Sequence, residues 1–196
     1  ARFVFNPFGG FHHAGMDHAE GFCYINDVAV AISELVSRGR RVAYIDIDAH
    51  HGNGVQDAFY GTNRVLKISF HESGETLYPG SGLVRESGEG EGAGYNVNVP
   101  LRAGTDDEVY LLAFEALVPP LIEGFRPDIV VACAGGDTHY EDPLAHLNLT
   151  SNGYRRAISI INQVSPRVLA LGSGGYRPHK TAALWTLAWA EFSGLQ

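Results

Sequence analysis

Cysteine is scarce in this chain, with two residues among 196, Cys23 and Cys133. Both lie in apolar stretches, so we interpret them as buried thiols of a reducing compartment rather than as a disulfide. Long apolar runs are also missing. No stretch approaches the roughly 20 residues of a membrane-spanning helix, and no signal peptide is visible at the start. We therefore expect a cytoplasmic protein without a membrane partner.

Positive charge is scarce as well. Lysine and arginine number 14 against 22 aspartates and glutamates, which gives a formal net charge of −8. Proteins that bind nucleic acid directly usually carry a basic face, so we expect no such partner. Hydrophobic residues make up 45% of the chain, which suits one globular domain over residues 1–196. The sequence is compatible with either a monomer or a homo-oligomer.

Helical and strand patterns alternate along the sequence, which is typical of a parallel α/β sheet. We predict strands over about 41–48, 65–70, 95–99, 128–134 and 167–171. We predict helices over about 26–39 and 55–60, behind a capping box at Thr105–Glu108, from about 150 onward, and over 179–192. Pro119-Pro120 should break or kink the helix that contains them, and residues 1–25 and 71–94 should be loops.

Polar and glycine-rich clusters follow one predicted strand after another: Asp48 and His50, then His71, Asp137 and Tyr176. In open α/β sheets the ligand site lies beyond the carboxyl ends of the strands, so these positions agree with the fold rule. Asp46, Asp48 and, if the strand persists that far, His50 should share one face of their strand. This pattern predicts a metal site.

The donor types favour zinc. Asp48-x-His50 offers two ligands at one strand end, and Asp137 offers a third at another. Three protein ligands leave an open coordination position, as a catalytic zinc requires.

Other polar side chains are suited to proton transfer. His12 and His13 are candidates for moving protons at neutral pH. Tyr176, on a glycine-rich loop, can donate a hydrogen bond to a developing oxyanion. Together with a metal, these groups predict hydrolytic chemistry.

The motifs resemble those of the histone deacetylase family, in particular its bacterial acetoin-utilisation type. The matching segments run in family order: Gly9–Ala14, Gly21–Asp27, Tyr44–Gly54, His71–Ser73, Tyr78–Gly80, Tyr95–Pro100, Gly136–Thr138, Asp142-Pro143 and Gly172–Tyr176. Each is modest alone, and together they are highly specific. The resemblance implies a three-layer α/β/α fold with a mainly parallel sheet, the arginase/deacetylase fold. We expect a partial deacetylase domain, because the family's first strands and its rim loop do not precede the histidine pair.

The resemblance also implies residue roles. The matching positions are Asp48, His50 and Asp137 for zinc, and His12, His13, Asp46, Asn53 and Tyr176 for catalysis. His12, oriented by Asp46, would deprotonate the attacking water, and His13 would protonate the departing amine. Tyr176 would help zinc to polarise the acyl carbonyl. Asn53 stands beside His13 where many members carry Asp, and a neutral amide stabilises a charged imidazole less.

Two further sets follow from the resemblance. The substrate channel would be formed by Gly21, Phe22 and Tyr78, with Leu144 at its rim. A structural potassium ion would lie near the zinc, at Asp46, Asp48, His50, Ser69 and the backbone carbonyl of Phe70.

The implied function is zinc-dependent removal of acetyl or other acyl groups from acetyl-lysine, in proteins or peptides, or from a similar acylated amine. One alternative is an acetylpolyamine or small acyl-amide deacetylase, because acetylpolyamine deacetylases also carry Asn at the position of Asn53. A second is a truncated fragment of the family that folds without turning over substrate. Arginase-type hydrolases share the fold and use two manganese ions, but Gly52 stands where their second-metal ligand belongs.

Overall fold

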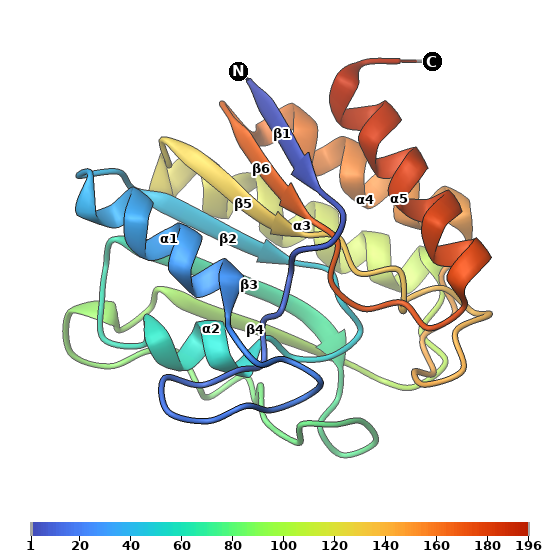
Figure 1. Ribbon diagram of the computed structural model, residues 1–196, viewed down its shortest axis with the longest axis horizontal. Helices are drawn as coiled ribbons and strands as arrows, with labels where there is room; N and C mark the ends of the chain where they lie inside the picture. The colour runs from blue at the N-terminus through green and yellow to red at the C-terminus, as the bar shows by residue number, and fades with distance from the viewer. Residues whose placement is uncertain (1, 196) are drawn as a thin grey trace.

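The computed structural model describes residues 2–195, and within them one sheet holds six strands in the order β1-β6-β5-β2-β3-β4 (Figure 1). The strands are β1 Phe3–Asn6, β2 Val42–Asp46, β3 Val65–Glu72, β4 Asn96–Leu101, β5 Ile129–Cys133 and β6 Val168–Leu171. The helices are α1 Asp27–Ser37, α2 Asn53–Ala58, α3 Asp107–Phe125, α4 Ser151–Val164 and α5 Pro178–Ser193, with a 3₁₀ turn at Gly90–Gly92. Every neighbouring pair of these strands runs parallel.

Helices cover both faces of the sheet, which confirms the predicted three-layer α/β/α architecture (Figure 1). Alternation along β2 shows how the layers form. Ala43 and Ile45 pack in the large core with residues of α3, α4 and α5. Val42 and Tyr44 face the other way, into the smaller core with α1 and α2. Asp46 follows this period, so it points toward the α1 side of the sheet.

Most helices begin within one residue of the predicted start, although α2 begins at Asn53 rather than near residue 55. Asn26 caps α1 through Ala29 N, and Thr150 caps α4, in agreement with the helix starts predicted near residues 26 and 150. The capping box was placed one residue early, because Asp106 and not Thr105 caps α3. The Thr105 hydroxyl donates instead to Arg102 O at 2.7 Å and so is committed to the preceding turn.

The prediction that Pro119-Pro120 would break or kink the helix was wrong, since α3 continues through both to Phe125. The two prolines remove the hydrogen bonds that would reach the carbonyls of Glu115 and Ala116. Both residues are exposed, so water can solvate the freed carbonyls. Val118 and Ile122, one turn apart, are buried against the sheet on either side of the prolines and hold the helix axis in place.

Strand bounds differ from the predictions at several ends, and three of these differences follow from particular contacts. β1 lies inside the segment 1–25 that was predicted to be loop, and it pairs with β6, about which local sequence says nothing. β2 ends at Asp46 rather than near residue 48, because Asp46 Oδ1 accepts from Asp48 N at 3.0 Å and turns the chain. β3 extends to Glu72, whose N–H donates to Ala49 O.

The structure bears on two expectations from the sequence, one about the two cysteines and one about membrane-spanning helices. Cys23 and Cys133 are both buried and free, which confirms their interpretation as thiols. Among residues 2–195, no helix is both long enough and apolar enough to cross a bilayer.

Phe114 gives the most direct test of the larger core. It is fully buried, with ring centroids 4.7 Å from Phe70 and 5.9 Å from Tyr110. We expect Phe114→Ala to lower the free energy of unfolding by about 3–5 kcal/mol, because it leaves a cavity. Leu112→Ala, at an exposed position of the same helix, should change it by no more than about 0.5 kcal/mol. Urea denaturation of both variants measures the difference, and equal losses would contradict this packing.

Candidate metal and catalytic site

The candidate site lies beyond the carboxyl ends of the parallel strands. Asp48 and His50 follow β2, Asp137 follows β5, and Tyr176 follows β6. The segment after β1 descends to the same edge of the sheet and carries the histidine pair (Figure 1). The fold therefore gathers side chains from distant parts of the sequence.

Asp48, His50 and Asp137 form one buried cluster. His50 Nδ1 lies 2.9 Å from Asp137 Oδ2 and 3.1 Å from Asp48 Oδ1. One donor atom from each residue lies within 4.8 Å of the others. One imidazole and two carboxylates are donors that zinc accepts, and three protein ligands are the set of a catalytic zinc site. The residues present thus fit the ion that the sequence predicted.

Charge in this cluster is poorly solvated. Burial disfavours a charged His50, but hydrogen bonds to Asp137 and Asp48 outweigh it and raise the pKa of His50 to about 11. Burial, together with the neighbouring charge of Asp48, raises the pKa of Asp137. The two carboxylates therefore need a positive charge between them. A divalent cation would supply it and would compete with the proton on His50.

The two carboxylates of this cluster are held by groups that the sequence analysis did not assign. Asp48 Oδ2 accepts from the Ser173 hydroxyl at 2.8 Å and from Gly174 N at 2.6 Å. Asp137 Oδ1 accepts from Ala49 N at 2.8 Å. A Cβ at Gly174 would lie 2.1 Å from Asp137 Oδ2, so only glycine fits there. In the sequence, only the glycine-rich run Gly172–Gly175 indicated that this loop lies close to the carboxylates.

His12 and His13 form a second cluster beside the first. His12 Nδ1 donates to Asp46 Oδ2 at 2.8 Å, and the same oxygen accepts from the Tyr44 hydroxyl. His13 Nδ1 donates to Asn53 Oδ1 at 2.7 Å. The two Nε2 atoms face each other at 3.1 Å. The structure thus places Asp46 and Asn53 where the resemblance implied. Tyr44 was missed, although it shares a strand face with Asp46.

The two imidazoles differ in charge. Burial opposes a charge on His12, but the carboxylates of Asp46 and Asp48 outweigh it and raise the pKa of His12 to about 9. Burial and the charge on His12 lower the pKa of His13 to about 4. At neutral pH the proton between the two rings therefore belongs to His12, and His13 is neutral.

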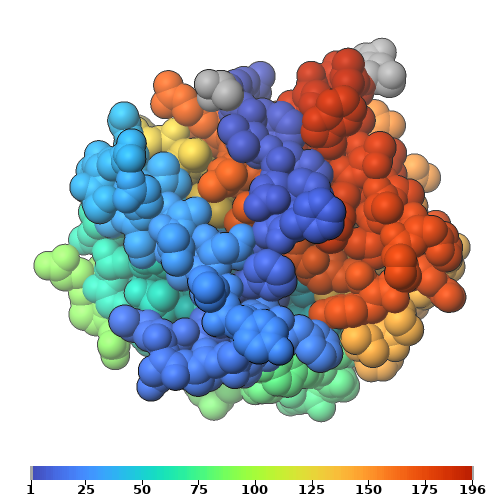
Figure 2. All heavy atoms as spheres, viewed as in Figure 1, coloured from blue at the N-terminus to red at the C-terminus, as the bar shows by residue number. Residues whose placement is uncertain are grey.

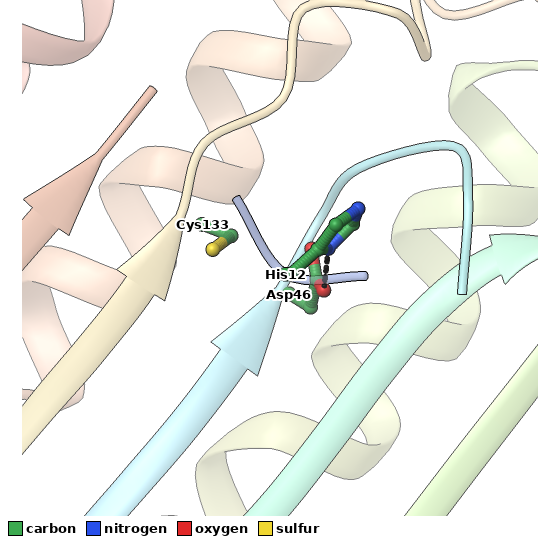
Figure 3. Close-up of side chains that lie close together, drawn as sticks. All are labelled: His12, Asp46 and Cys133. Atoms are coloured by element: carbon green, nitrogen blue, oxygen red, sulfur yellow. Dashed lines mark hydrogen bonds and ion pairs between the residues drawn. The ribbon is translucent and has the colours of Figure 1, made fainter. Parts of the chain in front are cut away.

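Figure 3 shows a third group at the ends of β2 and β5, formed by His12, Asp46 and Cys133. Its donor atoms are close enough for a metal, but their chemistry argues against one. Asp46 Oδ2 already accepts from His12 and Tyr44. Burial holds the pKa of the Cys133 thiol well above its usual value, so it stays protonated, whereas a metal needs the thiolate.

A cavity of about 230 Å³ opens next to the histidine pair and is lined by His12, His13, Gly21, Phe22 and Tyr176, among others. The Phe22 and Tyr176 rings lie 6.1 Å apart, centroid to centroid. A Cβ at Gly21 would lie 2.3 Å from the His13 ring, which explains the glycine. Figure 2 shows the first part of the chain (dark blue) lying between α1 (light blue) and the C-terminal residues (red).

Two other predicted channel residues do not line this cavity. Tyr78 lies against His13, with ring centroids 5.2 Å apart, and Leu144 is 45% exposed. Of the predicted potassium set, Ser69 lies in register with Asp46 on the neighbouring strand. The Ser69 hydroxyl is hydrogen-bonded to His71 Nδ1 at 2.8 Å, and Phe70 is fully buried.

The chain matches the model of the histone deacetylase domain over residues 1–192. It belongs to the histone deacetylase family. It is 46% identical over 178 residues to probable histone deacetylase 1-B of Xenopus laevis, covering 91% of this chain and 37% of that protein. It is 41% identical over 186 residues to histone deacetylase clr6 of Schizosaccharomyces pombe, covering 95% of this chain and 46% of that protein.

Solved structures of family members agree with the fold. A histone deacetylase homologue from Aquifex aeolicus superposes with a TM-score of 0.94 at 44% identity, over 98% of this chain and 52% of that one. A homologue complexed with SAHA gives the same values. The chain thus spans between about a third and about a half of the lengths of these relatives.

Metal content tests the three-ligand cluster. We expect the chain to hold one zinc ion, and Asp137→Asn to lose it because one of three ligands becomes neutral. Asp57→Asn removes an exposed carboxylate on α2 and should leave the metal content unchanged. Elemental analysis after dialysis against dilute zinc measures all three proteins.

Added zinc should raise the melting temperature of the wild type and of Asp57→Asn but not of Asp137→Asn, because the ion binds only the folded site. Two ions per chain, or full zinc content in Asp137→Asn, would show that Asp48, His50 and Asp137 do not form a single three-ligand zinc site.

Proposed function

We propose that this domain is a zinc-dependent amidohydrolase that removes acetyl or other acyl groups from acetyl-lysine or a similar acylated amine. The observation that supports it best is the position of the two clusters. Asp48, His50 and Asp137 offer a three-ligand metal site, and the imidazoles of His12 and His13 lie beside it at the wall of a cavity. Family membership supports the same reaction class.

Zinc, when bound by Asp48, His50 and Asp137, would supply Lewis-acid charge for the acyl carbonyl and lower the pKa of water. The chain supplies the rest. The Tyr176 ring lies beside the His50 ring, with centroids 6.2 Å apart, and its hydroxyl would donate a hydrogen bond to the developing oxyanion. Burial, followed by nearby carboxylates, raises the pKa of Tyr176 far above its usual value, so the phenol keeps its proton.

We propose that His13 carries the proton transfers. It is the neutral imidazole, with a lone pair on Nε2, so it can take a proton from the attacking water and pass it to the departing amine. His12, held charged by Asp46, would stabilise negative charge on the reacting acyl group. This division differs from the one that the resemblance implies, in which His12 is the base.

The alternative hypotheses, an arginase-type hydrolase and a non-catalytic fragment, differ from this proposal in observable ways. For the arginase-type reaction a second metal needs a ligand at position 52, where a Cβ would lie 2.5 Å from Asp46 Oδ2, so no side chain fits. A fragment that folds without turnover would show no hydrolysis in the wild type. The potassium ion, the cytoplasmic location and any homo-oligomer stay predictions.

Tyr176→Phe tests the oxyanion role. We expect kcat for a fluorogenic acetyl-lysine peptide to fall by about 100-fold or more, because one hydrogen-bond donor to the oxyanion is lost. Zinc content and melting temperature should stay the same. Tyr140→Phe, which alters an exposed tyrosine, should keep kcat within about twofold. Unchanged kcat in Tyr176→Phe would remove Tyr176 from the mechanism, and no turnover in the wild type would favour the non-catalytic alternative.

Substrate class is open to a direct comparison. We expect a higher kcat/KM for an acetyl-lysine peptide than for a mono-acetylated aliphatic diamine, since the relatives named above are histone deacetylases. Steady-state assays of amine release measure both. A preference for the diamine by tenfold or more would instead support the acetylpolyamine alternative.

A further inference from the structure

Asn53 lies between the His13 imidazole and a carboxylate that the sequence analysis did not single out. His13 Nδ1 donates to Asn53 Oδ1 at 2.7 Å. On its other side, Asn53 Nδ2 donates to Glu20 Oε1 at 3.3 Å. The three side chains therefore form a chain of hydrogen bonds that leads from the catalytic imidazole to a negative charge.

This arrangement fixes the direction of every hydrogen bond in the chain. A carboxylate only accepts, so Glu20 requires the amide NH₂ of Asn53 to face it. The amide oxygen must then face His13, whose Nδ1 must carry the proton. His13 Nε2 is left with a lone pair, and it points at His12 Nε2 at 3.1 Å. Glu20 thus selects the tautomer of His13 that can accept a proton in the cavity.

Glu20 itself is held in place. The Tyr78 hydroxyl donates to Glu20 Oε1 at 2.5 Å. Its backbone forms a two-way bridge with Cys23, with N–O distances of 3.0 and 2.7 Å. The other carboxylate oxygen lies 3.1 Å from His18 Nε2. The hydrogen bond from Tyr78 lowers the pKa of Glu20, so it remains a carboxylate at neutral pH.

We propose that Glu20 is a positioning residue for catalysis: acting through Asn53, it holds His13 in the Nδ1–H tautomer and stabilises the imidazolium that forms during proton transfer. The kinetic part of this inference rests on the proposed function. Asn53 alone cannot do this, because a neutral amide can turn either end toward the ring. The negative charge thus lies on Glu20, one side chain beyond the Asn53 amide that contacts the imidazole.

The inference makes Glu20 and Asn53 interdependent. In Asn53→Asp a carboxylate would touch His13 directly and would select the same tautomer without help. Glu20 should then be dispensable for catalysis. Substitutions that act through one hydrogen-bonded chain are non-additive in this way, whereas independent structural effects add.

The kinetic test compares Glu20→Gln in the wild-type and Asn53→Asp backgrounds, with zinc supplied. We expect Glu20→Gln to lower kcat by about tenfold in the wild-type background, with KM within about twofold, and to cost nothing in Asn53→Asp. Asp17→Asn is the matched control, because Asp17 lies on the same loop and touches His18 but not Asn53. It should leave kcat unchanged. Equal losses in both backgrounds, or equal losses in Asp17→Asn and Glu20→Gln, would overturn the inference.

A second readout does not need activity. Nitrogen-15 chemical shifts of labelled histidine distinguish the two tautomers, and a His13→Gln spectrum assigns the His13 signals. We expect only the Nδ1–H form at His13 in the wild type and Asp17→Asn, and a mixture of both forms in Glu20→Gln. A wild type without turnover would refute the proposed function, while the tautomer result would still decide the role of Glu20. An unchanged tautomer in Glu20→Gln would overturn that role.

Discussion

Compensation of buried negative charge is the constraint on which the rest of this structure depends. Asp46, Asp48 and Asp137 are each no more than 1% exposed and lie at the carboxyl ends of adjacent strands. Carboxylates in such surroundings cost several kcal/mol unless they are paired, hydrogen-bonded or bound to a metal. His12 compensates Asp46, and His50 lies between the other two. The two imidazoles offset the negative charge of the buried carboxylates at the strand ends, and the charge that remains favours a bound cation.

The loops around these carboxylates are built to let them approach one another. Gly52 and Gly174 lie so close to Asp46 and Asp137 that a Cβ at either position would overlap a carboxylate oxygen. Backbone N–H groups donate to the oxygens that the histidines leave free, as Ala49 N does to Asp137. Close packing therefore leaves no room for a side chain at position 52, where the ligand for a second metal would have to stand.

A structural feature could be predicted from the sequence where contacts between nearby residues determine it, and was missed where contacts between distant residues do. Alternating patterns predicted the parallel sheet. The position of Asp48, His50 and Asp137 after two predicted strands indicated the candidate metal cluster, because the carboxyl ends of parallel strands meet at one edge of a sheet. β1 was missed because it pairs with β6, which lies about 165 residues further along the sequence (Phe3 pairs with Val168). The helix through Pro119-Pro120 was missed because packing of its buried face outweighs two lost hydrogen bonds. Glu20 was missed because its contact to Asn53 depends on how a loop folds over the site, which no spacing rule describes.

The central claim is that one metal ion satisfies the buried acid of this site. Anomalous diffraction at the zinc absorption edge, from crystals grown with zinc and manganese both present, tests it most directly. The account predicts a single zinc peak about 2.0–2.2 Å from donor atoms of Asp48, His50 and Asp137. Two metal peaks, a peak elsewhere with these residues unliganded, or no metal peak at all would contradict it.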